Sequence, residues 1–201
     1  MTGFGVGAAA HVPWTAPALT FVNSTDGAIL SNTNRTISGD SDGSSETGRS
    51  STDIFIDGGK YYWETVITSI NSNYIDGDCR PGIYRGSSTA DNEPNFCIIF
   101  NPSGTNLFNH NGNGTYYSVA NYTPSIGGII NGDVFMWALD LVKYEMYVGK
   151  NGIWYNSSDP TTGFNPCISG IFPGQTLSAA WKGYTTSDVM TFPSSNNYPT
   201  P

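Results

Sequence analysis

Charged residues are scarce in this 201-residue chain: they make up 12% of it, about half the share of an average domain. Sixteen residues are acidic and eight are basic, so the formal net charge is −8, and the basic residues form no cluster. Nucleic-acid binding depends on Lys and Arg side chains that neutralise phosphates. The composition therefore argues against nucleic acid and anionic membranes as partners.

Histidine and glutamate, two of the commonest catalytic residues, are rare as well. The chain has two histidines, His11 and His110, and four glutamates. Two enzymatic arrangements remain open: a triad built on His110, and a glycosidase-type carboxylate pair formed by Glu64 and Asp140. No G-x-S-x-G motif accompanies His110, and a lone His in a loop is usually solvated. We therefore expect a non-enzymatic protein without catalytic residues.

Cysteines and metal-binding patterns are few. Cys79, Cys97 and Cys167 are widely spaced and odd in number, so they indicate neither a disulfide framework nor a zinc site. Three buried thiols are favoured, and one disulfide stays open. Asp40–Gly43 and Asp76–Asp78 resemble fragments of a calcium loop but lack its other ligands. We expect no metal and no cofactor.

Long apolar runs are also missing, so we expect no membrane insertion. The N-terminus shows no basic region followed by an apolar helix, and hence no recognisable signal peptide. Residues 1–18 are small and uncharged, with isolated apolar side chains at Phe4, Val6 and Trp14. We predict that they form an arm that docks onto a neighbouring protein through these three side chains; a frayed terminus is the alternative.

Turn residues and β-prone residues are abundant, with 24 Gly, 12 Pro and 13% aromatic residues. Short β-prone runs between turn signals predict one all-β domain, a sandwich or barrel without a substantial helix. A strand at Ala28–Ser31 is expected to continue from Asn32 to Ile37. The Asn151-Gly152 pair predicts a type I′ hairpin turn.

Two segments show strand periodicity most clearly. Lys60–Ile70 alternates between two faces, and Val134–Leu141 does the same with both sets apolar. The first face of Lys60–Ile70 consists of Tyr61, Trp63, Thr65 and Ile67, and the second of Tyr62, Glu64, Val66 and Thr68.

Four segments occur in an order that matches a known family: Leu30–Asn34 (LSNTN), Gly59–Glu64 (GKYYWE), Gly132–Asp140 (GDVFMWALD) and Lys150–Gly152 (KNG). In these segments the chain resembles the SPRY domain, a twisted antiparallel β-sandwich that serves as a binding module. The following DPTTG loop is similar to the branch of the family found in tailed bacteriophages. Met136 departs from the pattern, because the family usually has Gly there.

The resemblance implies a SPRY-like sandwich over residues 19–193, preceded by the arm (1–18) and followed by a C-terminal coil (194–201). It places Glu64 and Asp140 at structural positions that hydrogen-bond turns. It also implies a structural or binding module of a bacteriophage particle, assembled in the host cytoplasm, either a capsid decoration or a tail-fibre adhesin for host attachment. The arm would contact other virion proteins, and the loops a host-surface protein or glycan. A free-standing carbohydrate- or peptide-binding module is the alternative, and a polysaccharide hydrolase is less favoured.

Aromatic residues in loops and at strand ends are the candidate ligand-binding residues, because aromatic rings beside Asn and Asp bind sugars and peptides by stacking and hydrogen bonding. The alternative is that these residues close the sandwich core, which we expect for at least half of them. The candidates are Tyr116, Tyr117, Tyr122, Tyr155, Trp181 and Tyr184.

Overall fold

A computed structural model describes the side chains of residues 12–21, 28–39, 58–70, 81–84, 130–170, 177–183 and 185–201. It also describes the backbone of residues 22–23, 46–50, 85, 96–101, 104–110 and 116–118. Within these ranges the structure is all-β, apart from a short 3-10 turn at Tyr155–Ser157. No helix in the described ranges has the length and apolar character that crossing a membrane requires. The all-β prediction is confirmed.

Sheet A contains nine of the described strands, and seven of them follow the order β13-β12-β11-β6-β16-β4-β3. The two others are short: β14 pairs with β12, and β1 pairs with β6. The β1–β6 pair is parallel, whereas the remaining pairs in the sheet are antiparallel. The strands are β1 (Trp14–Thr15), β3 (Ile29–Ser31), β4 (Thr36–Ser38), β6 (Lys60–Ser69), β11 (Val134–Asp140), β12 (Glu145–Lys150), β13 (Ile153–Trp154), β14 (Ile168–Ser169) and β16 (Val189–Thr191).

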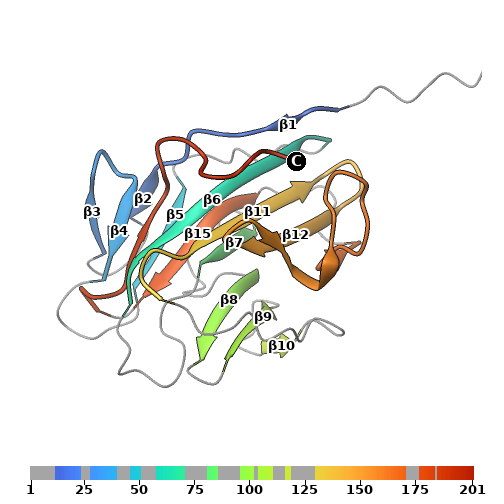
Figure 1. Cartoon of the computed structure of the whole chain (residues 1–201). Helices are drawn as coiled ribbons and strands as arrows, with labels where there is room; N and C mark the ends of the chain where they lie inside the picture. Colours follow the sequence, from blue (N-terminus) through green and yellow to red (C-terminus); the bar gives the residue numbers. More distant parts are fainter. Residues whose placement is uncertain are drawn as a thin grey trace, which may run out of the picture.

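Sheet B contains seven described strands in the order β10-β9-β8-β7-β15-β5-β2, all antiparallel to their neighbours. Its strands β7 and β15 lie behind β6 and β11 in Figure 1, so the two sheets form the layers of a sandwich. The strands are β2 (Phe21–Asn23), β5 (Glu46–Ser50), β7 (Gly82–Arg85), β8 (Phe96–Asn101), β9 (Gly104–His110), β10 (Tyr116–Ser118) and β15 (Leu177–Gly183).

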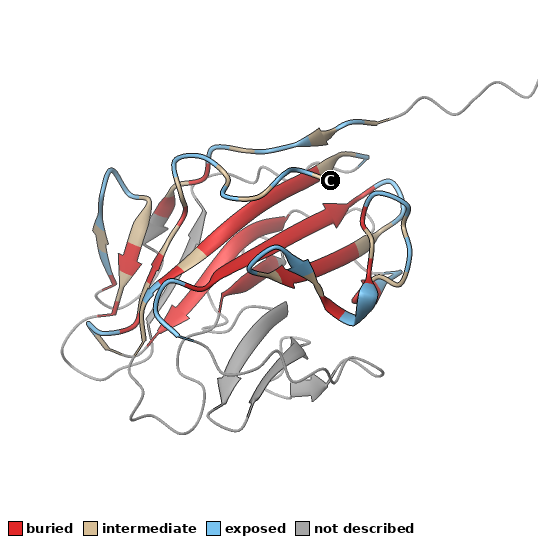
Figure 2. Ribbon diagram, viewed as in Figure 1, coloured by how far each residue is buried: buried red, intermediate tan, exposed pale blue. Residues whose placement is uncertain are grey.

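The main core lies between the two sheets and is built by the alternation that the sequence predicts. Trp63 of β6 and Trp137 of β11 are directly opposite each other, and their rings stack with centroids 5.9 Å apart. The Trp137 indole N–H donates a 3.0 Å hydrogen bond to Thr65 Oγ1, which satisfies a buried polar group. Buried residues run along β6, β11, β12 and β15 in Figure 2. The predicted faces of β6 are therefore confirmed.

The hairpin prediction at Asn151-Gly152 is also confirmed. These two residues join β12 to β13 and have φ angles of 50° and 85°, as a type I′ turn requires.

The predicted strand from Asn32 to Ile37 is wrong in its first part. Asn32, Thr33 and Asn34 have positive φ angles and form a turn between β3 and β4. The short polar side chain of Asn tolerates this left-handed conformation, which interrupts the strand.

Candidate functional site

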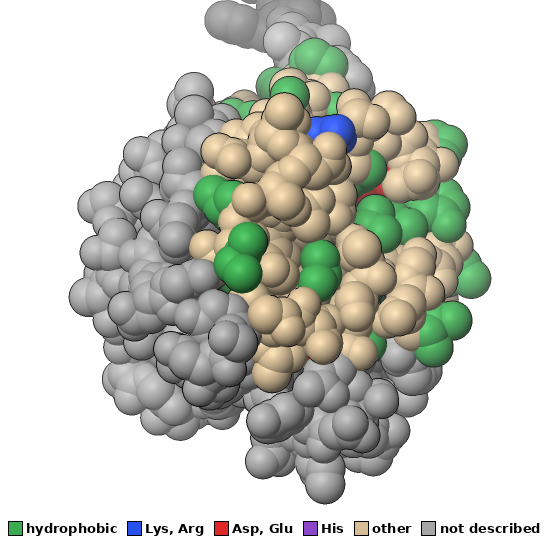
Figure 3. Space-filling model, turned by 90° about the vertical axis from the view of Figure 1, so that its left-hand side faces the viewer, with side chains coloured by type: hydrophobic (Ala, Val, Ile, Leu, Met, Phe, Trp, Pro, Cys, Tyr) green, Lys and Arg blue, Asp and Glu red, His purple; other side chains and the backbone are tan. Residues whose placement is uncertain are grey.

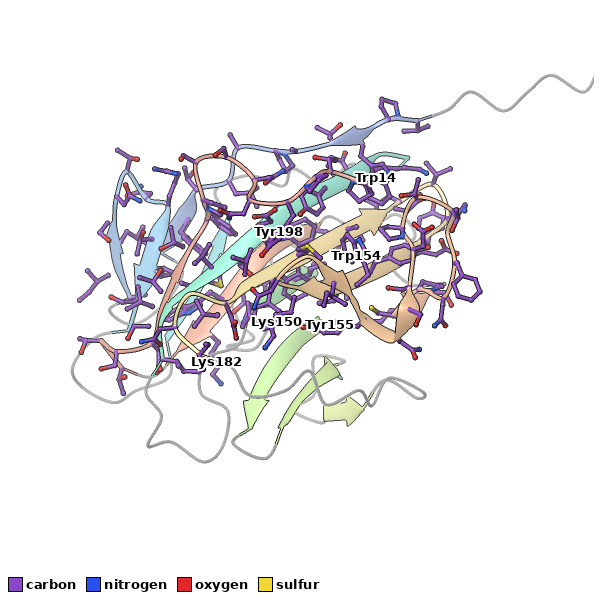
Figure 4. All side chains as sticks on the ribbon, viewed as in Figure 1. Trp14, Lys150, Trp154, Tyr155, Lys182 and Tyr198 are labelled. Carbon is purple, nitrogen blue, oxygen red and sulfur yellow. The ribbon has the colours of Figure 1, made fainter. Side chains whose placement is uncertain are left out.

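A second hydrophobic cluster lies on the outer face of sheet A, away from the main core. The strand register places Ala138 of β11 between Tyr62 of β6 and Tyr147 of β12. The Tyr62 ring meets the ring of Trp154 edge-on, with centroids 6.2 Å apart. We call this cluster the aromatic face: it has a buried floor of Tyr62, Met136, Ala138 and Tyr147, on which the partly buried Trp14, Trp154 and Tyr198 pack. Figure 4 labels these last three side chains, which come from β1, β13 and the C-terminal tail.

Met136 fills this face at the position where the resembling family usually has glycine. Its partner in the register is Gly149 of β12. A Cβ atom on Gly149 would overlap the methyl group of Met136 and approach the carbonyl oxygen of Ile153 to 2.8 Å. Met136 on β11 therefore fits because Gly149 on β12 has no side chain. The departure from the family pattern alters the floor of the aromatic face without disturbing the strands.

Glu64 stands at one end of the aromatic face with its side chain buried, since only 1% of the residue is exposed. Its Oε1 accepts hydrogen bonds from the Tyr62 hydroxyl at 2.7 Å and from the Tyr198 backbone N–H at 2.8 Å. Its Oε2 accepts two more from Asn197, one from the backbone N–H at 2.7 Å and one from the side-chain amide at 2.8 Å. Four donors satisfy the buried carboxylate, which suits a structural role.

Two tyrosines of the aromatic face are held in their neutral form. Burial, and then the hydrogen bond to Glu64, raise the pKa of the Tyr62 hydroxyl far above its usual value of 10.0. Burial and the 2.6 Å hydrogen bond to Glu145 raise the pKa of Tyr147 in the same way. Both hydroxyls therefore stay protonated and donate hydrogen bonds at neutral pH, so neither phenolate is available there as a general base.

Asp140, the other candidate catalytic carboxylate, stabilises a turn. Its Oδ1 accepts hydrogen bonds from the backbone N–H groups of Val142 at 2.9 Å and Lys143 at 3.1 Å. Its Oδ2 lies 3.0 Å from Lys60 Nζ, which also sits 5.4 Å from the centre of the Trp14 ring. These contacts agree with the structural position that the family resemblance implies.

The register keeps the two carboxylates apart. Asp140 is opposite Lys60, whereas Glu64 lies four residues further along the same strand. At a rise of about 3.3 Å per residue the backbone positions of the two residues are about 13 Å apart along the strands. A glycosidase pair requires about 5–9.5 Å. Because each carboxylate is also bonded to its own structural partners, Glu64 and Asp140 are not arranged as the catalytic pair that the sequence left open.

The predicted KNG hairpin is locked by a third acidic residue, Asp133. It accepts hydrogen bonds from Ile130 N–H at 3.0 Å, from the Asn151 amide at 2.7 Å and from Lys150 Nζ at 3.2 Å. Asn151 Oδ1 in turn accepts the Val134 N–H at 2.8 Å. Burial raises the pKa of Asp133, but these hydrogen bonds and the Lys150 charge outweigh it, so the pKa lies below its usual 3.8. The Gly132-Asp133 and Lys150-Asn151-Gly152 segments thus stabilise the hairpin through Asp133.

The structure places the predicted ligand-binding residues in two groups. Trp181 is completely buried on the inner face of β15, and Tyr155, which is 9% exposed, is buried within the main core cluster. This is the alternative that the sequence left open for them. The other four are untested predictions. Tyr116 and Tyr117 lie on β10, of which only the backbone is described, and Tyr122 and Tyr184 lie outside the described residues.

The predicted arm residues are also divided. Phe4 and Val6 lie outside the described residues, whereas Trp14 pairs with Lys60 in β1 and packs on the aromatic face. Trp14 therefore lies on the sandwich itself. Sequence reasoning missed Asn197 and Tyr198, because they stand in a tail that reads as a polar coil. The one available signal was Tyr198, a single aromatic residue in that tail.

Other chemistry is limited in the described part of the chain. No three His, Cys, Asp or Glu side chains there come close enough together to hold a metal ion. Asp40–Gly43, Asp76–Asp78, His11 and the side chain of His110 lie outside the described residues. A hollow of about 10 Å³ lies next to Trp63, Glu64 and Asn196, which is room for about one water molecule. The thiol of Cys167 is buried, and its Sγ accepts a hydrogen bond from the Val148 N–H at 3.1 Å.

Comparison with known proteins establishes the fold. No protein-family profile and no curated protein matches the sequence. Among solved structures, the SPRY domain of human HERC1 is similar with a TM-score of 0.55 and 17% identity, over 82% of this chain and 90% of that one. A second human SPRY domain gives 0.52 and 16%, over 88% and 98%. The neuralized NHR1 domain of Drosophila melanogaster gives 0.51 and 12%, over 89% and 99%.

These similarities, together with the two sheets, define the chain as a protein with a SPRY-like β-sandwich fold. None of the three similar structures comes from a bacteriophage. The bacteriophage branch therefore rests on the sequence motifs alone and stays a prediction.

Proposed function

We propose that this chain is a non-enzymatic binding module, which acts by surface contact with another macromolecule. The observation that carries the proposal is the separation of Glu64 and Asp140, each of which is occupied by structural hydrogen bonds. The two carboxylates that were the best candidates for a catalytic pair are therefore excluded from that role. The SPRY-like fold supports the same conclusion, because it is typically a binding module.

The described surface suits contact with another macromolecule. Large apolar side chains are exposed at several turns and at β3 and β13. Figure 3, a view onto the end that carries β3 and β4, shows separate hydrophobic patches and very little charged surface among the described residues. When such a surface is buried against a partner, few charged groups lose their contact with water, so the free-energy cost of desolvation is small. The exposed residues are Ile29, Ile130, Val142, Ile153 and Phe164.

We further propose that the module belongs to a bacteriophage particle and is attached through its N-terminal segment. The motif resemblance supports the particle, and β1 supports the attachment. Trp14 and Thr15 pair with Lys60 and Tyr61 of β6, which fixes the point at which an N-terminal arm would join the sandwich. Phe4 and Val6 would then contact a neighbouring virion protein, while the loops contact a host-surface protein or glycan.

The deciding experiment is co-sedimentation of the native protein with large particles on a density gradient, with the copy number determined by mass spectrometry. A matched pair of variants tests the arm: deletion of residues 2–11, which leaves β1 in place, and Phe4→Ala with Val6→Ala. We expect both variants to keep the melting temperature of the wild type and to be lost from particles. Normal incorporation of the deletion variant would refute attachment through the arm.

Absence of the native protein from particles would refute the virion role and leave the free-standing binding module, which a glycan and peptide array would then probe. The non-enzymatic part of the proposal has its own test. The wild type and the Glu64→Gln and Asp140→Asn variants are assayed for polysaccharide hydrolysis. Hydrolysis by the wild type that either substitution abolishes would overturn the non-enzymatic proposal.

A further inference from the structure

The C-terminal tail crosses the outer face of sheet A in the way that a bound peptide would. It contributes no strand to either sheet. It is nevertheless held there by Asn197, whose N–H and side-chain amide both reach Glu64 Oε2, and by Tyr198, whose N–H reaches Glu64 Oε1. Figure 4 shows Tyr198 on the same side of the sheet as Trp14 and Trp154.

The contacts at Glu64 select for asparagine. One carboxylate oxygen accepts two donors from the same residue, a backbone N–H at 2.7 Å and a side-chain N–H at 2.8 Å. An aspartate at this position has no side-chain donor and would bring a second negative charge to a buried carboxylate. A leucine or alanine would leave one of the bonds unmade.

The next residue is selected by shape. The Tyr198 ring lies directly over Gly152 in the type I′ turn, where a Cβ atom would come within 2.9 Å of the ring. The ring also packs on the aromatic face. A flat side chain therefore fits between the turn and the aromatic face. The site combines one buried acceptor for an Asn with one aromatic slot for the residue after it.

The tail can leave this site without unfolding the sandwich. Phe192 stays fixed, because its N–H donates a 2.8 Å bond to the Arg35 carbonyl and its ring stacks on Phe21 with centroids 4.2 Å apart. Ser194 and Ser195, which follow, are exposed. The segment from Asn196 onward is thus joined to the fold by a short solvated connection, which is the arrangement that permits exchange between copies.

We propose that the outer face of sheet A is a peptide-recognition site for an Asn-Tyr segment, and that it accepts the Asn197-Tyr198 segment of a second copy of this chain. A second copy carries the sequence whose fit the structure displays. Exchange replaces every contact of the tail by the same contact, so it costs little beyond the loss of independent motion. Within one copy the effective concentration of the tail is about millimolar. Exchange is therefore expected when copies are concentrated in an array. The proposal is independent of the proposed function.

A peptide titration tests the recognition. The protein is the full chain with Asn197→Gly and Tyr198→Ala, which weakens its own tail and leaves Glu64, Trp14, Trp154 and the floor of the aromatic face intact. The probe is a synthetic peptide of residues 195–201, SNNYPTP, and binding is followed by the fluorescence of Trp14 and Trp154. We expect saturable binding, and binding at least about tenfold weaker for the matched peptide SNDYPTP. No binding, or equal binding of the two peptides, would overturn the proposal.

A mixing experiment tests the second copy. One full-chain variant, Glu64→Gln, has an intact tail and an impaired site, and the variant used above has the reverse. We expect a one-to-one complex in the mixture by native mass spectrometry, and none when Glu64→Gln is combined with a chain that carries all three substitutions. If Glu64→Gln fails to fold, Gly152→Ala replaces it as the impaired site. Absence of the mixed complex at millimolar concentration would refute exchange between copies.

Discussion

Glu64 and Asn197 are 133 positions apart in the sequence and share two hydrogen bonds, both to Glu64 Oε2. Glu64 is buried in the middle of β6, and Asn197 is in the polar tail near the end of the chain. The carboxylate that looked like a candidate catalytic group therefore fastens the C-terminus to the sandwich. One of the four glutamates of this SPRY-like domain therefore has a structural role, which is to hold the C-terminal tail on sheet A.

The first prediction concerns that fastening. In Glu64→Gln an NH₂ group replaces one of the two acceptor oxygens and faces N–H donors that it cannot accept from. We expect the free energy of unfolding to fall by about 1–3 kcal/mol. The backbone amides of Asn197 and Tyr198 should also lose protection from hydrogen exchange. Urea denaturation and exchange measured by mass spectrometry check the two effects.

Glu145→Gln is the matched control for this variant. Glu145 is on the neighbouring part of the outer face and accepts one hydrogen bond, from Tyr147 at 2.6 Å. We expect a smaller loss of stability and no change in exchange at the tail. Equal exchange in both variants would contradict the role assigned to Glu64.

The second prediction separates the backbone requirement at a glycine from its packing. Gly152 and Gly58 have nearly the same φ, 85° and 82°, but only Gly152 has a neighbour, the Tyr198 ring. Alanine at either position must adopt the left-handed conformation, which lowers the free energy of unfolding by about 1–2 kcal/mol. Gly152→Ala should cost more than Gly58→Ala in chemical denaturation, because the new methyl group displaces Tyr198. Adding Tyr198→Ala to both variants should remove the difference between them.

The third prediction is a pH dependence at the KNG hairpin. Asp133 has a folded-state pKa below its usual 3.8, so it contributes stability above pH 3.8, which is lost as pH falls through the lower, folded-state pKa. Asp133→Asn removes this contribution. The variant should be less stable than the wild type at neutral pH, and the gap should narrow below pH 3.8. Urea midpoints of both proteins across this range give the test, and a gap independent of pH would contradict it.

The fourth prediction concerns the hydrogen bond inside the main core. Thr65→Val preserves the shape of the side chain but removes the acceptor of the Trp137 indole N–H, which it meets at 3.0 Å. A buried donor without a partner costs about 1–3 kcal/mol. Thermal or urea denaturation should show this loss. Thr68→Val is the control: Thr68 is exposed and its hydroxyl bonds to Thr191 Oγ1 at 2.8 Å, so we expect a change within about 0.5 kcal/mol.

The elements that the sequence predicted well are those set by neighbours in the chain. The two-residue period of Lys60–Ile70 gave the two faces of β6, because side chains of a strand point alternately to opposite sides. Asn151-Gly152 gave its turn, because few residues tolerate the positive φ angles. The failure at Asn32–Asn34 is of the same local kind, since Asn-rich segments favour turns and that signal was read as strand.

The candidate site could be predicted only in part. Sequence order could not show that Trp181 and Tyr155 point into the core, because an aromatic residue near a strand end is equally suited to the surface and to the core. It also could not give the distance between Glu64 and Asp140, which follows from the register of β6 against β11. Register depends on which faces of the two strands are buried together. It is therefore set by the pairing of two separate segments and cannot be read from either segment alone.

The sequence by itself determined the class of the fold: its alternating apolar residues and its turn residues predict an all-β domain, a sandwich or barrel. Only the tertiary structure decided what the outer face of sheet A does. There Glu64 and Gly152, from two distant segments, meet the tail residues Asn197 and Tyr198, and Trp14 packs on the same aromatic face. The reason is physical: backbone preferences act over a few residues, whereas a buried carboxylate takes its donors from whichever segment the packing of the two sheets brings within reach.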